Sequence, residues 1–297
     1  MNPGSGNDQT TLDFTLKYNP PMDHEAAERN LKHIKSILDS LGVVFMMGSG
    51  SCLGAVRDGA FIPWDDDIDL VTVLGVNGTT ENSIDTTTEA FRAAGYHADR
   101  LDGTGSSTVM TMRDGVRVSL EWLRISGDHV LTYPGISLPT SMFTQPKEID
   151  FLGERFNVPN PPEEYLALKY GPEWQTPRRT GEYERDVVVK VPSVEIEGSP
   201  CWVRVLDESD NPVAGAEISL VGGATSRTDA QGYAEVTLPG SYYFALMIRY
   251  PGHEEVLYME ELEPGGRFVY RAGSMAAARQ EAGGETGTIG NVMTREE

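Results

Sequence analysis

The sequence contains only two cysteines, Cys52 and Cys201, among its 297 residues. Two cysteines so far apart form neither a disulfide framework nor a metal-binding spacing, and they fit a reducing environment. The N-terminus, MNPGSGNDQT, has no basic start followed by an apolar run, and no apolar stretch is as long as a membrane span. The sequence therefore predicts a cytoplasmic protein without a membrane-spanning segment.

Basic residues are also scarce. The chain has 24 lysines and arginines against 45 aspartates and glutamates, and its formal net charge is −21. Such a surface repels nucleic acid and anionic lipid, so we expect no nucleic-acid partner. An acidic composition also serves solubility, and it does not by itself indicate a substrate. With 39% hydrophobic residues, the chain is long enough for one large core or two smaller ones.

Helices and strands are both expected in the first 180 residues. Residues 24–41 place apolar side chains at steps of three and four, which predicts an amphipathic helix ending at Gly42. The segment 107–125 indicates two strands joined at Asp114-Gly115, a strong hairpin signal. The other expected elements are strands at 43–47, 67–73, near 129–133 and near 155–158, and helices at 51–58, 86–95 and 161–171. The pattern is typical of an α+β domain with a mixed sheet and flanking helices.

The composition changes near residue 185. Between 185 and 272 the helical period is absent and short strand-like runs alternate with turn residues, which predicts a small all-β sandwich. Residues 273–297 are small, polar and without period, as in a disordered tail. The sequence thus divides into an N-terminal extension at 1–22, an α+β domain at 23–184, the sandwich and the tail.

Four aspartates lie close together in PWDDDIDL, residues 63–70. Side chains of a strand alternate between its faces, so Asp67 and Asp69 point to one side, about 6.6 Å apart along the backbone. Asp65 joins them if the strand begins early. Carboxylates on one face can bind a hard divalent cation, which removes their mutual repulsion. The alternative is a solvated acidic turn, although the apolar residues nearby place this run at the edge of a core.

A calcium-binding loop is excluded, because Leu70 and Val76 stand where that loop requires glycine and glutamate. A glycine- and serine-rich turn, GSGS at 48–51, comes before the aspartates. A glycine turn at the start of a short helix presents backbone N–H groups to a phosphate. We therefore expect Gly50 and Ser51 to bind a phosphate beside a cation. Strand, glycine turn, helix and a strand with Asp-x-Asp is the layout of the nucleotidyltransferase fold.

Two segments resemble a known family. GSCLGAVRDGAFIPWDDDIDL is similar to the signature of the LicD and fukutin-related phosphotransferases, in which G-[ST]-x-L-G-A-x-R leads into I-P-W-D-D-D-I-D. FNVPNPPEEYLALKYGPEWQTP, at 156–177, resembles the closing segment of the same family. The resemblance covers roughly residues 25–180. From Asp207 to Leu246 the chain also resembles carboxypeptidase regulatory-like sandwiches, and those matching turn residues indicate fold and not activity.

The resemblance implies a phosphotransferase that moves a phosphorylated small alcohol, such as phosphocholine or ribitol phosphate, from a CDP-linked donor to a glycan hydroxyl and releases CMP. It implies Mg²⁺ as the cofactor, with Mn²⁺ as the alternative ion, and acceptors such as lipopolysaccharide or teichoic acid. Two other functions stay open. One is a nucleotidyltransferase that uses an NTP and releases pyrophosphate, and the other is a catalytically degenerate module that binds a nucleotide or a glycan.

The same resemblance implies roles for individual residues. The metal ligands would be Asp65, Asp67, Asp69 and Glu121, the donor phosphates would meet Gly50 and Ser51, and the catalytic residues would be Asp67, Asp69, Glu121 and Arg57. Glu121 departs from the family, which usually has aspartate there, and it is alternatively a surface residue of an edge strand. Arg57 would stabilise phosphoryl oxygens, or it forms a structural salt bridge to a neighbouring aspartate. Asp58 is a second departure, since the family often has histidine there.

Overall fold

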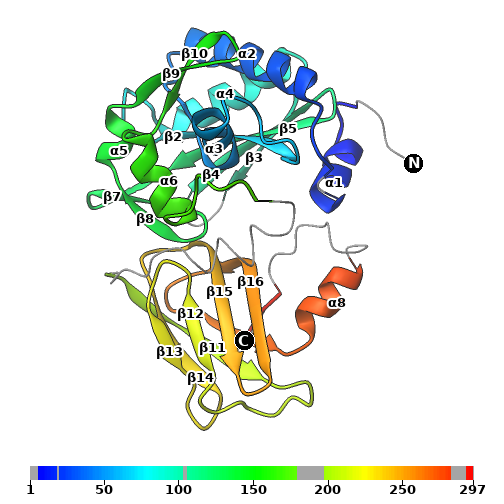
Figure 1. The fold of residues 1–297 in the computed structure, drawn as a ribbon, viewed down its shortest axis with the longest axis vertical. Helices are drawn as coiled ribbons and strands as arrows, with labels where there is room; N and C mark the ends of the chain where they lie inside the picture. Colours follow the sequence, from blue (N-terminus) through cyan, green and yellow to red (C-terminus); the bar gives the residue numbers. More distant parts are fainter. Residues whose placement is uncertain (1–5, 19, 103–105, 179–196, 282–291, 297) are drawn as a thin grey trace. The chain divides into compact units, whose positions relative to one another are not determined.

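The computed structural model describes residues 6–18, 20–102, 106–178, 197–281 and 292–296. The chain forms two compact units. Unit 1 comprises Met1–Val130 and Leu138–Ala167, and unit 2 comprises Leu131–Ser137 and Leu168–Glu297. Figure 1 shows helices and strands together in unit 1, whereas unit 2 consists mainly of strands. The domain boundary expected at residues 184 and 185 lies outside the described residues.

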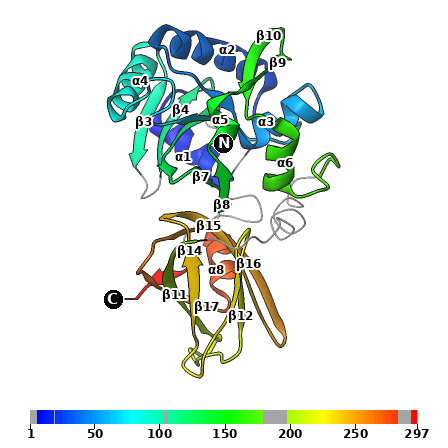
Figure 2. The same cartoon turned by 90° about the vertical axis from the view of Figure 1, so that its left-hand side faces the viewer.

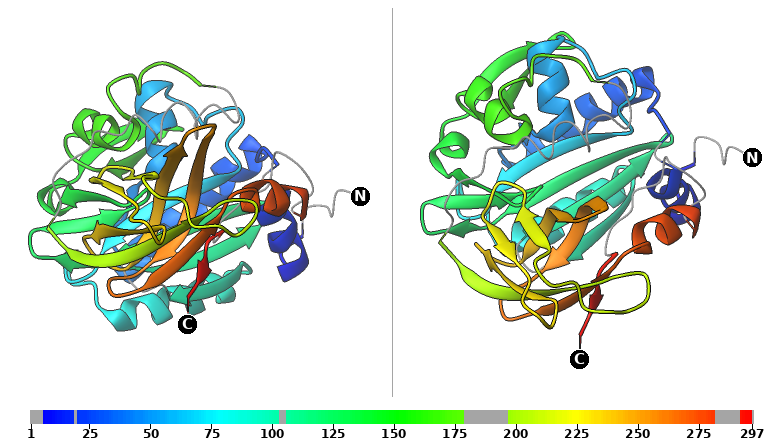
Figure 3. Two further views of the ribbon diagram at one scale, coloured as in Figure 1. Left: turned by 90° about the horizontal axis from the view of Figure 1, so that it is seen from below. Right: turned by 60° about the horizontal axis from the view of Figure 1, so that its bottom comes forward.

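Unit 1 is built on a five-stranded mixed sheet with the strand order β1-β2-β5-β4-β3. Strands β2 and β5 are parallel, and the other neighbours are antiparallel. The right-hand view of Figure 3 shows the long strands of this sheet side by side. The strands are β1 Met46–Met47, β2 Asp67–Val73, β3 His97–Asp102, β4 Ser106–Arg113 and β5 Val116–Leu123. The one parallel pair is central to the site, because it aligns β2 and β5 in the same direction.

Helices cover this sheet. They are α1 Gln9–Tyr18, α2 His24–Leu41, α3 Ser49–Arg57, α4 Glu81–Ala93, α5 Ser141–Thr144 and α6 Pro162–Tyr170. Helices α2 and α4 contact one another and the sheet, and Figure 2 shows α4 beside β3. The remaining strands of this part of the chain are β6 Ile125–Ser126, β7 His129–Thr132, β8 Ile136–Pro139, β9 Lys147–Phe151 and β10 Glu154–Val158. The α+β class predicted from the sequence is confirmed, and no described helix is both long and apolar enough to span a membrane.

Local signals explain where several elements begin and end. The side chain of Asp23 accepts a hydrogen bond from the Ala26 N–H at 2.8 Å, and Gly42 ends α2 in the left-handed conformation with φ 68°. Asp114 and Gly115 both have positive φ, 52° and 73°, as a two-residue hairpin turn requires. The predicted helix at 24–41 and the predicted hairpin are therefore confirmed.

The strand expected at 43–47 is shorter than predicted, because only Met46 and Met47 pair with β2. Carbonyl groups of the two preceding residues accept hydrogen bonds from side chains instead. Thr72 Oγ1 donates to the Val44 carbonyl at 2.8 Å, and Asn157 Nδ2 donates to the Phe45 carbonyl at 3.3 Å. Hydrogen bonds from side chains thus replace the ladder that a longer strand would form.

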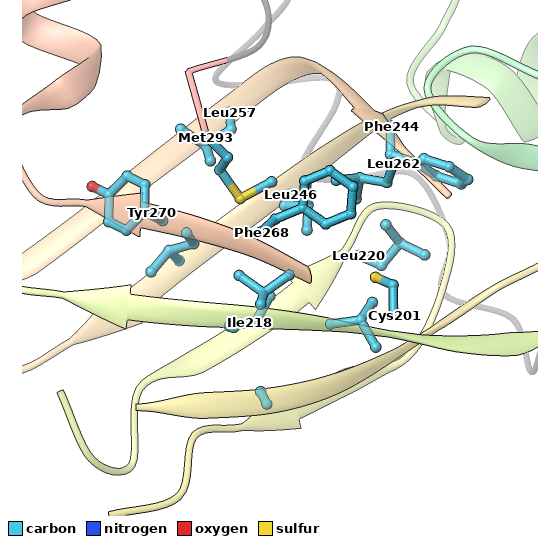
Figure 4. Packing of buried hydrophobic residues seen from close by; sticks show 14 of the residues in the cluster. Cys201, Ile218, Leu220, Phe244, Leu246, Leu257, Leu262, Phe268, Tyr270 and Met293 are labelled. Atoms are coloured by element: carbon cyan, nitrogen blue, oxygen red, sulfur yellow. The ribbon is translucent and has the colours of Figure 1, made fainter. Parts of the chain in front are cut away.

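Unit 2 contains two four-stranded sheets, with the strand orders β14-β11-β17-β18 and β13-β12-β15-β16. Their strands are β11 Ser199–Leu206, β12 Glu217–Leu220, β13 Thr225–Arg227, β14 Tyr233–Leu238, β15 Tyr242–Tyr250, β16 His253–Leu262, β17 Arg267–Arg271 and β18 Thr294–Arg295. Buried side chains of both sheets form one cluster, in which Cys201, Ile218 and Phe244 take part (Figure 4). An all-β sandwich follows from two sheets that share one apolar core.

The C-terminal part of unit 2 corrects the predicted disordered tail. Helix α8 spans Ser274–Glu281, and β18 pairs with β17. Met275 and Met293 are buried in the core of the sandwich. The buried Glu260 carboxylate accepts the N–H groups of Val292 and Met293 at 2.9 and 3.0 Å. Single anchoring residues order these segments, and such anchors leave no periodic signal in the sequence. Residues 282–291 lie outside the described residues.

Candidate active site

The parallel pairing of β2 and β5 gathers the polar residues of unit 1 on one face of the sheet. Asp67 lies opposite Arg117, Asp69 opposite Ser119, and Val71 opposite Glu121. Residues paired across neighbouring strands point to the same face, and so do residues two apart along a strand. Asp67, Asp69 and Glu121 therefore share one face. The intervening residues of β2, including Ile68 and Leu70, are buried.

The glycine- and serine-rich turn is hydrogen-bonded to Asp69. The Gly48 N–H donates to the Asp69 carbonyl at 3.0 Å, and the Gly50 N–H donates to Asp69 Oδ2 at 3.2 Å. The Asp69 N–H in turn donates to Ser51 Oγ at 3.0 Å. Because Ser49, the first residue of α3, has φ 36°, the chain turns sharply where this helix begins. Gly50 and Ser51 thus hold Asp69 in position, while their predicted contact with a phosphate stays a prediction.

Gly50 leaves room for Asp65. A Cβ atom on Gly50 would lie 2.7 Å from Asp65 Oδ2, which is closer than such contacts allow. Burial, together with the charges of Asp67, Asp69 and Asp66, raises the pKa of Asp65 well above its ordinary value. Carboxyl groups are therefore crowded next to the turn, in a place that a side chain at position 50 would fill.

Three consecutive carboxylates form the tightest acidic group among the described residues. Asp65, Asp66 and Asp67 each offer an oxygen within 4.8 Å of the other two. Burial, and then the charge of Asp67, raise the pKa of Asp66 to about 6 although Arg117 opposes that shift. The donor set consists only of carboxylate oxygens, the ligands that Mg²⁺ and Mn²⁺ prefer. The group fits a hard divalent cation by its charge and its donor chemistry.

Arg117 is a residue of this site that the sequence interpretation missed. Its guanidinium donates to Asp66, and its Nε and Nη2 each lie 3.3 Å from Asp67 Oδ2. Arg117 has the same parity along its strand as Glu121, and strand alternation could have placed it on the same face. Arg117 lies opposite Asp67, which is 50 residues earlier in the chain, and the sequence alone does not reveal that these two strands are neighbours.

Glu121 is half-buried and lies opposite Val71, two paired positions beyond Ser119, the partner of Asp69. The residue opposite Asp69 is Ser119, whose hydroxyl donates to Asp69 Oδ1 at 3.3 Å. Ser119 was also missed. Glu121 stands outside the group of three closely spaced carboxylates described above. To act as a metal ligand, Glu121 would have to reach the cation with its longer side chain, and this role stays a prediction.

Tyr165 joins the closing segment to the turn. Its buried hydroxyl accepts the Ser49 N–H at 3.0 Å. Burial raises the pKa of Tyr165 well above its ordinary value, and Cys52, Asp69 and Glu121 contribute with their charges. Tyr165 therefore lies near both Asp69 and Glu121. Tyr165 belongs to α6, and no local sequence pattern indicates that it reaches the turn at the start of α3.

Arg57 forms the ion pair that was one of its two expected roles. Its Nε and Nη2 contact the two carboxylate oxygens of Asp58 at 2.9 and 2.6 Å, and its side chain is 8% exposed. In this arrangement the guanidinium is directed to Asp58. Contact with a phosphoryl oxygen would require Arg57 to leave that partner or share it, so this role stays a prediction.

Replacing Gly50 with alanine is expected to weaken binding of Mg²⁺ about tenfold, because the new Cβ displaces the Asp65 carboxylate from the acidic group. Isothermal calorimetry with Mg²⁺ measures this change. Gly240→Ala is the matched control, since its Cβ would meet only Leu131 at 3.9 Å. An unchanged Mg²⁺ affinity in Gly50→Ala would show that Asp65 lies outside the cation site.

Part of the chain is similar to known proteins. Residues 42–161 match the family model described as LicD/FKTN/FKRP, nucleotidyltransferase domain. Over 68 residues the chain is 35% identical to ribitol 5-phosphate transferase FKRP of Homo sapiens, a match that covers 23% of this chain and 14% of the relative. The Mus musculus protein of the same name is 35% identical over 65 residues, covering 22% of this chain and 13% of the relative. The match thus spans a small part of both relatives.

Two solved structures show partial similarity. The complex of ANT(2")-Ia with adenylyl-2"-tobramycin has a TM-score of 0.34 and 14% identity, and the match covers 45% of this chain and 68% of the other. The Cid1 poly(U) polymerase with bound MgGTP has a TM-score of 0.27 and 7% identity, covering 39% of this chain and 38% of the other.

The family match includes the glycine- and serine-rich turn, helix α3, the Asp-x-Asp strand β2 and strand β5, which carries Glu121. These are the elements that the structure brings together on one face of the sheet. Residues 42–161 of the chain therefore match the nucleotidyltransferase domain of the LicD/FKTN/FKRP family.

Proposed function

We propose that the protein is a metal-dependent phosphotransferase, which moves a phosphorylated small alcohol from a CDP-linked donor to a hydroxyl of a glycan and releases CMP. The observation that carries this proposal is the hydrogen bonding of the turn at 48–51 to Asp69, on the face that Asp69 shares with Asp67 and Glu121. That arrangement puts backbone N–H groups beside carboxylates, as a site for a metal-bound phosphate requires. The name of the two FKRP relatives agrees with a sugar-alcohol phosphate as the transferred group.

The cation would be held by Asp67 and Asp69, with Asp65 and Glu121 as further ligands. When bound, Mg²⁺ or Mn²⁺ supplies positive charge against the donor diphosphate. The chain itself has an excess of acidic residues, with a net charge of −21, so a bound dication would offset the charge of the diphosphate. Arg57 would contribute if it turns from Asp58. The Ser51 N–H would contribute its dipole, and so would the Gly50 N–H if Asp69 shares it with a phosphate oxygen.

In the proposed reaction the acceptor hydroxyl oxygen forms a bond to the phosphorus of the transferred group. The bond from this phosphorus to the oxygen of CMP breaks, and CMP leaves with the electron pair of that bond. The hydroxyl proton goes to a carboxylate of the chain. Glu121 is our candidate for the carboxylate that takes this proton, because it lies on the same face as Asp67 and Asp69 and is half-buried.

A second candidate is a nucleotidyltransferase that uses an NTP and releases pyrophosphate. The description of the matching family model favours it, and the same aspartates would serve it. The third is a binding module without catalysis, which the departures of Glu121 and Asp58 from the family pattern favour. The pair Asp67 and Asp69 fits all three, so the reaction products must separate them.

A panel of donors tests the proposal. The full chain is incubated with Mg²⁺, a glycan acceptor and, in turn, CDP-choline, CDP-ribitol, CDP-glycerol or each NTP, and CMP and pyrophosphate are measured by chromatography. We expect CMP from one of the CDP-linked donors and none when EDTA is added. Pyrophosphate from an NTP would instead establish the second candidate. If Mg²⁺ and nucleotide bind but neither product forms, the module is not a catalyst.

A further inference from the structure

Arg117 is a charged residue placed almost entirely out of solvent. Its side chain is 5% exposed, and it lies on the central strand β5, between β2 and β4. A guanidinium stays protonated in proteins, so Arg117 carries its positive charge into the interior. Burial of such a charge is tolerated only when carboxylates compensate it. The carboxylates that do so are Asp66 and Asp67.

The two ion pairs of Arg117 differ. Its Nη2 contacts Asp66 closely, whereas the contacts from Nε and Nη2 to Asp67 Oδ2 are both 3.3 Å long. The third nitrogen, Nη1, is buried and has no hydrogen-bond partner among the described residues. The hydrogen bonds of this guanidinium are thus incompletely satisfied. Asp66 is the firm partner, and Asp67 is the one that Arg117 holds loosely.

We propose that Arg117 is a built-in counter-cation of the site, which holds Asp67 in position and competes with the divalent cation for its carboxylate. This inference rests on the proposed function, because it takes Asp67 as a metal ligand. Arg117 is a positioning residue in this role. It lowers the affinity for the cation and keeps Asp67 ordered before a cation arrives.

The pairing with Asp66 makes this exchange feasible. When a cation takes Asp67, Arg117 keeps its contact with Asp66 and is not left as an isolated buried charge. A fixed positive charge next to a metal ligand repels an arriving dication, so its removal should increase cation affinity. A purely structural salt bridge between β2 and β5 predicts the opposite. Loss of a purely structural salt bridge would disorder Asp67 and weaken cation binding.

Calorimetric titration of the full chain with MgCl₂ and with MnCl₂ separates these alternatives. We expect Arg117→Met to bind both cations at least about tenfold more tightly than the wild type. Arg100→Met is the matched control, because it removes one positive charge from the same unit. Arg100 lies on edge strand β3, where it pairs with Asp85 and Asp102, and we expect its variant to match the wild type.

A second variant covers the possibility that Arg117→Met does not fold. Lysine keeps the charge but cannot contact Asp66 and Asp67 with a planar fork, so Arg117→Lys should compete less and bind Mg²⁺ about threefold more tightly. Circular dichroism verifies the fold of each variant. Unchanged or weaker cation binding in a folded Arg117 variant overturns the inference and leaves the proposed function intact. If neither the wild type nor a folded Arg117 variant binds a cation, the metal site of the proposed function fails as well.

Discussion

Asp69→Asn is expected to lower the rate of phosphate transfer by at least about 100-fold, because asparagine removes a negative charge and a metal ligand. The effect should be large because Asp69 joins the two halves of the site. Its carboxylate accepts hydrogen bonds from Gly50 and Ser119, and its N–H binds Ser51. Asparagine has nearly the same shape and can keep one of the two side-chain contacts, so the fold should persist. Release of CMP from the donor that the panel identifies measures the rate.

Asp99→Asn is the control for this substitution. Asp99 is on edge strand β3, where it pairs with Arg92, and the same change there should leave transfer at the wild-type rate. Calorimetry with Mg²⁺ on both variants separates lost metal binding from a lost catalytic step. If Asp69→Asn transfers phosphate at the wild-type rate, β2 does not carry the catalytic centre and the proposed function is wrong.

Phe244→Ala is expected to destabilise unit 2 by about 3–5 kcal/mol, the range for removing a large aromatic side chain from a core. Phe244 is fully buried in the cluster shared by both sheets (Figure 4). It also packs on Gly135, where an added Cβ would lie only 2.2 Å from the ring. The surroundings of Phe244 are thus tightly filled, and alanine would leave a cavity. Urea unfolding followed by tryptophan fluorescence and circular dichroism measures the free energy change.

Two further variants calibrate this measurement. Phe244→Leu keeps most of the buried volume and should cost less than Phe244→Ala. Glu235→Ala, at an exposed position of β14, should shift the free energy of unfolding by no more than about 0.5 kcal/mol. If Phe244→Ala is no more costly than Glu235→Ala, the two sheets do not share the core that the structure shows.

Local patterns predicted much of unit 1. The apolar spacing of residues 24–41 and the dipeptide Asp114-Gly115 indicated a helix and a hairpin, and both are present. The alternation of strand side chains also placed Asp67 and Asp69 on one face, since that property depends only on neighbours along the chain. These features rest on interactions within a few residues, which is why the sequence alone sufficed for them.

Other features required contacts between distant segments. Glu121 was expected as the third carboxylate, but no local pattern indicates that Ser119 lies opposite Asp69 or that Arg117 lies opposite Asp67. The tail showed no periodic pattern, yet Met293 is anchored in the core by tertiary packing.

The sequence by itself determined most helices and strands of unit 1, the acidic strand and the glycine turn before it. Only the tertiary structure decided which basic side chain faces the aspartates. The parallel register of β2 and β5 brings Arg117 to Asp67, which is 50 residues earlier in the chain. Register depends on packing and hydrogen bonding between whole strands, and a one-residue shift would exchange the faces of every side chain. The partner of Asp67 is therefore a property of the folded sheet and not of the motif that contains it.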